Sequence, residues 1–180
     1  MIEIRPGDYF CVRTKSPISM PIIIMEKRFS IDKQAEYNHA GIIVKSDGTT
    51  YESLKRIAHY DINFYRGCKI LIARHRFMTE EAFEKGYKEV LRWNRKAYPW
   101  WRLLLFPVGM ARCFHPLGIP VCSELSREHQ VHSGVVDAEL IAMHLEAAGV
   151  KQDGYGWTPD QLADEMRKSK FYDVIFEGVL

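Results

Sequence analysis

The stretch YNHAGIIV at residues 37–44 decides the fold expected for this chain. It places His39 at the start of a run of small and β-branched residues that is typical of a core strand. The turn signal SDG at residues 46–48 follows, and the short strand pattern TYES comes next at residues 50–53. If the two strands pair as a hairpin, His39 and Glu52 can lie at one end of the same small sheet.

Further strand patterns lie on both sides of this hairpin. Strands are expected at residues 8–13, 68–74 and 171–177, and the second of these has the clearest pattern. Residues 19–26 fit either a strand or the first turns of a helix, because Pro21 argues against a central strand.

Three helices are predicted in the second half of the chain. Thr79 is a candidate N-cap with acidic residues after it, and a helical period runs from there to about residue 96. A second helix is expected at residues 137–148, where Gly149 suits the position after the helix end. Thr158 followed by Pro159 predicts a third helix to about residue 168. The predicted class is α+β, with an antiparallel sheet or partial barrel packed against helices.

Length and composition favour one soluble domain over residues 1–180. A chain of 180 residues with 47% hydrophobic content can bury one sizeable core. A net charge of +2 gives no general attraction to nucleic acid. Neither a signal peptide nor an apolar run long enough for a bilayer is seen, and the four cysteines are irregularly spaced. We therefore expect a cytoplasmic protein with mostly buried thiols and no nucleic-acid partner.

The segment CSEL at residues 122–125 places a cysteine at a plausible helix start. Exposed backbone N–H groups and the helix dipole favour a thiolate at such a position, and a neighbouring imidazolium strengthens the effect. Cys122, His39 and a polar group that orients the imidazole are the parts of a cysteine nucleophile system. Glu52 could fill the third role, although a solvated carboxylate at a strand end is its plain alternative.

Several short segments together resemble the circularly permuted papain-like hydrolases, a YiiX-like and permuted NlpC-like group. Residues 38–44 resemble the family's histidine strand, and residues 51–53 resemble the strand with a carboxylate that follows it. CSEL at residues 122–125 matches the nucleophile motif letter for letter. The remaining similar segments are PGD at residues 6–8, YPW at residues 98–100, LEAAGV at residues 145–150 and TPDQL at residues 158–162.

The resemblance implies a cysteine hydrolase that cleaves an amide bond through an acyl-enzyme and uses no cofactor. Cys122 would be the nucleophile, His39 the proton donor to the leaving group, and Glu52 the partner that orients the imidazole. The substrate class implied is peptide-like, with bacterial cell-wall peptides as the family's suggestion. A lipid-directed acyltransferase or thioesterase remains an alternative, because the same acyl-enzyme could pass to another acceptor.

One departure from the family pattern leaves the nucleophile open. In the family, the nucleophile begins the helix that ends in AAG, and counting back from residues 147–149 reaches Asp137. Either an insertion at residues 126–136 separates a catalytic Cys122 from that helix, or Asp137 occupies the nucleophile position. The second arrangement would make the chain an inactive binding or structural module. The literal CSEL match favours Cys122, whereas the more apolar helix at residues 137–148 favours Asp137.

The other candidate residues have plainer interpretations. Cys11, Cys68 and Cys113 are expected to be small core residues, with Cys11 and Cys68 on the inward faces of strands. The histidines expected at the surface are His59, His75 and His115. A metal site at His129 and His132 lacks further ligands at suitable spacing. The Trp- and Leu-rich residues 100–106 are more typical of a core than of a membrane contact, which stays an alternative.

Overall fold

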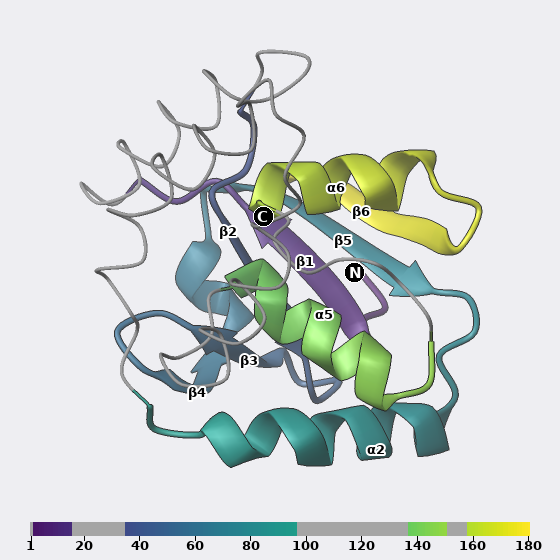
Figure 1. Cartoon of the computed structure of the whole chain (residues 1–180). Helices are drawn as coiled ribbons and strands as arrows, with labels where there is room; N and C mark the ends of the chain where they lie inside the picture. Colours follow the sequence, from purple (N-terminus) through teal and green to yellow (C-terminus); the bar gives the residue numbers. More distant parts are fainter. Residues whose placement is uncertain (1, 16–34, 97–136, 151–157) are drawn as a thin grey trace, which may run out of the picture.

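The computed structural model describes residues 2–15, 35–96, 137–150 and 158–180. Within these ranges six strands form one sheet in the order β4-β3-β2-β1-β5-β6, and every neighbouring pair is antiparallel (Figure 1). Their bounds are β1 Asp8–Val12, β2 His39–Ile43, β3 Thr49–Ser53, β4 Ile57–Asp61, β5 Lys69–His75 and β6 Tyr172–Val179. The prediction of an α+β protein with an antiparallel sheet is confirmed.

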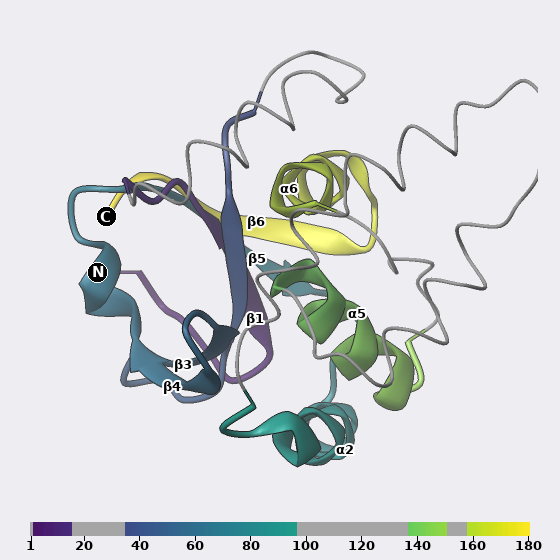
Figure 2. The same ribbon diagram turned by 60° about the vertical axis from the view of Figure 1, so that its left-hand side comes forward.

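Helices cover one face of this sheet. Helix α5 (Asp137–Ala147) and helix α6 (Pro159–Lys168) lie against the strands, and helix α2 (Glu80–Val90) packs against α5 (Figures 1 and 2). Two short 3₁₀ helices, η1 (Ile62–Tyr65) and η2 (Leu91–Trp93), follow β4 and α2.

The helix boundaries follow the capping residues in the sequence. The Thr79 hydroxyl accepts a hydrogen bond from the Ala82 backbone N–H at 3.1 Å, which begins α2. Thr158 and Gln161 form a reciprocal capping box at the start of α6. Gly149, with φ of 80°, follows the end of α5. All three predicted helices are present, although the regular part of the first ends earlier than expected.

The sheet is buried on both faces, because alternate side chains of the central strands point into two different apolar clusters. Tyr9, Ala40 and Ile42 belong to the cluster that includes the core residues of α5 and α6. Phe10 and Ile43 point the other way, into a second cluster that includes residues of η1. The His39 side chain, one residue before Ala40, lies on the face of this second cluster.

Strand β4 was not predicted from the sequence. It is an edge strand in which Ile57 is buried and His59 and Asp61 are exposed, so it lacks the long apolar pattern of a central strand. The expected element at residues 19–26 and the Trp- and Leu-rich segment at residues 100–106 lie outside the described residues.

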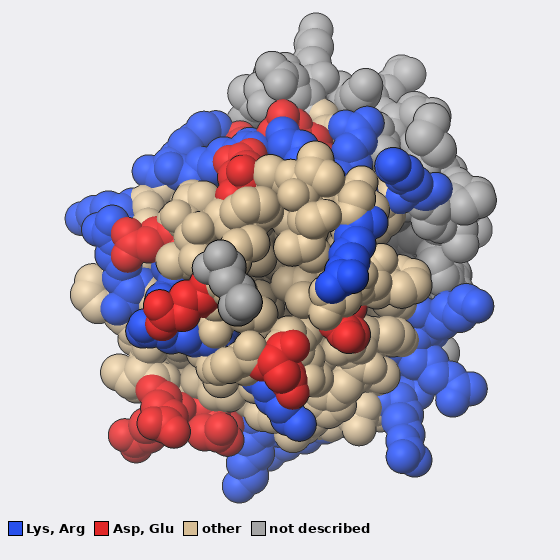
Figure 3. Space-filling view, turned by 180° about the vertical axis from the view of Figure 1, so that it is seen from behind, with Lys and Arg blue, Asp and Glu red and all other residues tan. Residues whose placement is uncertain are grey.

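The surface carries charges of both signs. Seen from behind, Lys and Arg side chains and Asp and Glu side chains are both spread over the described surface, with uncharged residues between them (Figure 3). Among the described helices, none has the length and apolar character needed to cross a membrane.

Candidate active site

The pairing register of β2 and β3 brings His39 and Glu52 together. Glu52 is directly opposite Gly41, so His39, two residues earlier, is its diagonal neighbour on the same face of the sheet. The imidazole Nε2 lies 2.5 Å from the Glu52 carboxylate oxygen Oε2. His39 is 4% exposed and Glu52 has no exposed surface. The expected contact between these two side chains is therefore present, and a solvated Glu52 is excluded.

Gly41 makes this diagonal contact sterically possible. A Cβ atom at residue 41 would lie 2.7 Å from the Phe10 ring and 2.9 Å from the Glu52 Cβ, both too close for any real side chain. Because glycine has no Cβ, the Phe10 ring from β1 and the Glu52 side chain from β3 can approach the middle of β2.

Two hydroxyl groups also bind Glu52. The Thr50 hydroxyl donates to Oε1, and the Tyr65 hydroxyl donates to Oε2, the oxygen that faces His39. Tyr65 is the last residue of η1, whose start is fixed by the Asp61 carboxylate accepting from the Asn63 backbone N–H. Both carboxylate oxygens thus have donors, as a buried carboxylate requires.

Aromatic rings fix the plane of the His39 imidazole. The Phe10 ring centroid lies 6.2 Å from that of His39 and the Tyr65 centroid 5.9 Å from it. An ionised carboxylate only accepts hydrogen bonds, so the Nε2 atom that faces Glu52 carries the proton in that state. Nδ1 is then the ring atom through which His39 could exchange a proton with a reacting group.

The nucleophile is not placed by the structure. Cys122 lies outside the described residues. Asp137 begins α5, and its side chain is outside the described part as well. Farther along this helix, Leu140 and Ile141 pack in the cluster of Ala40 and Ile42, on the sheet face opposite His39.

For the remaining cysteines and histidines, two predictions are confirmed, for Cys11 and His59, and two are wrong, for Cys68 and His75. Cys11 is fully buried in β1, as predicted. Cys68 was expected to point inward from a strand, but it precedes β5 and is only partly buried. His75 was expected at the surface, and this is wrong. It is 3% exposed, and its ring lies against those of Phe171 and Tyr172 at the end of the sheet.

His59 is exposed, as expected, and its Nε2 contacts the Tyr87 hydroxyl. Cys113, His115, His129 and His132 lie outside the described residues. Over the ranges that the structure describes, no group of three or more His, Cys, Asp or Glu side chains is arranged to hold a metal ion.

Sequence reasoning missed Thr50 and Tyr65. Thr50 could have been found, because it lies two residues before Glu52 in the same strand and therefore shares its face. Tyr65 gave no such signal, since it comes from the end of a short 3₁₀ helix after an unpredicted edge strand.

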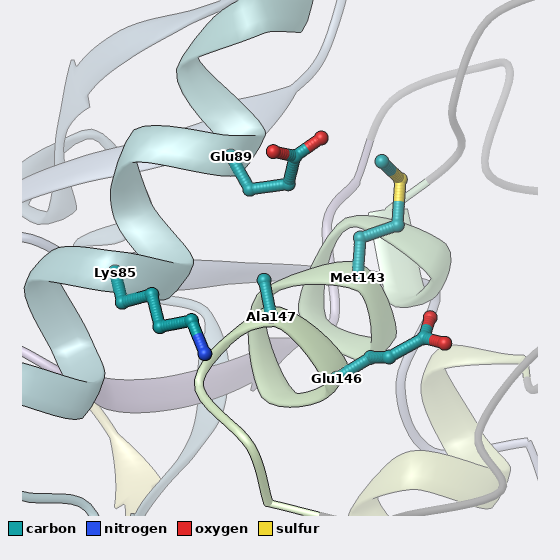
Figure 4. A pocket seen from close by; sticks show the side chains of 5 residues that line it. All are labelled: Lys85, Glu89, Met143, Glu146 and Ala147. Carbon is teal, nitrogen blue, oxygen red and sulfur yellow. The ribbon is translucent and has the colours of Figure 1, made fainter.

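A pocket of about 400 Å³ lies between α2 and α5, away from His39. Lys85 and Glu89 of α2 line it together with Met143, Glu146 and Ala147 of α5 (Figure 4). The pocket shares no side chain with the His39 site.

Comparison with known proteins adds no family assignment. The chain matches no protein-family model, and no curated protein sequence matches it.

Proposed function

We propose that this protein is a cysteine hydrolase of the permuted papain-like type, with Cys122 as nucleophile, His39 as acid and base, and Glu52 as the orienting carboxylate. The observation that carries the proposal is the buried hydrogen bond from His39 to Glu52, 2.5 Å long, at the start of a core strand. A carboxylate that fixes the tautomer and plane of an imidazole is what a nucleophile–histidine pair needs as its third member.

The proposed reaction begins with transfer of the Cys122 thiol proton to His39 Nδ1. The thiolate attacks the carbonyl carbon of an amide, and backbone N–H groups at the start of a helix stabilise the oxyanion. His39 returns the proton to the leaving nitrogen, so an amine departs and a thioester with Cys122 remains. His39 then takes a proton from water, the hydroxide attacks the thioester, and a carboxylic acid and the free thiol are released.

The negative charge of Glu52 stabilises the imidazolium present between these proton transfers. The substrate class that we propose is a peptide-like amide. The resemblance of residues 38–44 and 122–125 to the permuted hydrolases supports this choice. Transfer of the acyl group to an acceptor other than water would use the same first half-reaction.

The test is the selectivity of thiol labelling at neutral pH. An activated thiolate reacts quickly with iodoacetamide, whereas an ordinary or buried thiol reacts slowly. We expect peptide mass spectrometry of briefly treated protein to find the label at Cys122, with little at the buried Cys11 or the partly exposed Cys68. Cys122→Ser should lose the label and keep the thermal stability of the wild type.

Cys11 and Cys68 serve as internal controls. Labelling of the buried Cys11 would report unfolding, and labelling of Cys68 gives the rate for a thiol that is partly exposed but not activated. Labelling of Cys122 no faster than that of Cys68 would contradict an activated nucleophile. That result would favour the alternative of a binding or structural module.

A further inference from the structure

The Glu52 carboxylate is held by more groups than the imidazole alone. Oε2 accepts from both His39 and the Tyr65 hydroxyl, and Oε1 accepts from the Thr50 hydroxyl. These donors come from three separate elements, β2, η1 and β3. The carboxylate is therefore fixed from several directions and cannot turn without breaking a buried hydrogen bond.

The Tyr65 side chain has a second contact that matters for the site. Its ring centroid lies 5.9 Å from that of His39, and its hydroxyl donates to Glu52, so Tyr65 contacts both members of the His39–Glu52 pair. The hydroxyl holds the carboxylate and the ring limits the rotation of the imidazole. One residue thus sets the relative geometry of both groups.

We propose that Tyr65 and Thr50 are positioning residues that set the orientation and the charge balance of the His39–Glu52 pair. An effect of these two residues on catalysis rests on the proposed function. Each hydroxyl that donates to the carboxylate compensates part of its negative charge. How strongly Glu52 stabilises the His39 imidazolium therefore depends on both hydroxyls.

The test is an NMR titration of the His39 ring in ¹⁵N-labelled protein. In Tyr65→Phe the ring packing stays and only the hydroxyl is lost, so the Glu52 charge is compensated less and stabilises the imidazolium more. We expect the titration midpoint of His39 to rise by about half a pH unit or more. Thr50→Val removes the other hydroxyl without changing the side-chain shape, and should shift the midpoint in the same direction.

Among the described residues, contacts to the His39 ring come from β1, β3 and η1. Glu52 of β3 and Tyr65 of η1 contact the imidazole, and the uncharged Phe10 ring approaches from β1. Tyr60 of β4 lies farther out on the other side of Glu52. Burial, and next the charge of Glu52, raise the pKa of Tyr60 above its usual value.

Tyr51→Phe is the matched control. Tyr51 precedes Glu52 in β3 and is fully buried, but its hydroxyl donates to the Val90 carbonyl on the opposite face, at 3.2 Å. This variant loses a buried tyrosine hydrogen bond without touching the carboxylate. A purely structural effect would shift the titration midpoint of His39 equally in Tyr51→Phe and Tyr65→Phe. The proposal predicts that, of these two variants, only Tyr65→Phe shifts it.

An unchanged or lowered His39 midpoint in Tyr65→Phe, or in Thr50→Val if the first variant does not fold, would overturn the inference. The titration needs neither a reactive Cys122 nor a substrate. Failure of the proposed function would appear separately, as an unreactive Cys122 in the wild type.

Discussion

The burial and hydrogen bonding of Glu52 are the most informative features of this site. A carboxylate without exposed surface is costly unless it is paired and hydrogen-bonded, and here His39, Thr50 and Tyr65 supply those contacts. Breaking such an arrangement by removing one partner leaves an unpaired buried group, which costs more than the net stabilisation from the intact contact. Single substitutions at this site therefore need variants of unchanged shape.

Another buried histidine, His144, gives a prediction for the pH dependence of folding. Its Nδ1 lies 2.8 Å from the Tyr9 hydroxyl, and burial lowers its pKa to about 4, with a smaller opposing effect from the Phe83 backbone. An unfolded histidine binds a proton near pH 6.5. The stability due to neutral His144 is thus complete above about pH 6.5 and is lost as the pH falls toward 4, by up to about 3 kcal/mol.

The measurement is urea unfolding at several pH values between 4 and 7. His144→Asn has no group that titrates in this range and can keep a contact with Tyr9, so its stability should depend less steeply on pH. Wild type and variant curves that remain parallel over the whole range would show that His144 is not responsible for the acid sensitivity.

At the scale of elements, the close approach of β1, β2 and β3 depends on Gly41. Gly41→Ala would force a methyl group to within 3 Å of the Phe10 ring and the Glu52 Cβ. We expect a loss of about 1–3 kcal/mol in unfolding free energy, together with slower labelling of Cys122, because Glu52 is displaced from His39.

Gly178→Ala in β6 is the control for a glycine substitution in a strand. Its added methyl group would meet only the outer part of the Phe176 ring, at 3.1 Å, and the expected change in stability is within about 0.5 kcal/mol. Equal effects of the two substitutions on stability and labelling would argue against a special role for Gly41.

The elements with strong local signals were predictable from the sequence. The caps at Thr79 and Thr158 determine where two helices begin, and the turn at Gly48 connects the hairpin of β2 and β3. Strand β4 and η1 were missed, because an edge strand with exposed side chains and a single 3₁₀ turn have no strong periodic pattern. Because these two elements were not predicted, Tyr65, which donates a hydrogen bond to Glu52, was not identified as a site residue either.

At the scale of the whole molecule, the His39–Glu52 half of the proposed site could be predicted from the sequence and is present in the structure. The other half, Cys122, remains a prediction. His39 and Glu52 lie in adjacent strands, so hairpin register alone brings them together. Cys122 is far from both residues in the sequence, and no local periodicity specifies a contact between segments so far apart. The surface position predicted for His75 failed for the same kind of reason, since Phe171 and Tyr172, far along the chain, cover it.

The most direct test of the central claim is the pH dependence of Cys122 alkylation in the wild type, His39→Asn and Glu52→Gln. If His39 activates Cys122, the wild-type rate should change little between pH 6 and 8. In His39→Asn the rate should rise about tenfold per pH unit, as for an ordinary thiol of pKa about 8.5. Glu52→Gln keeps the side-chain shape but removes the charge that stabilises the imidazolium, so its curve should lie between the two. Three superimposable curves that all follow an ordinary thiol would contradict the claim.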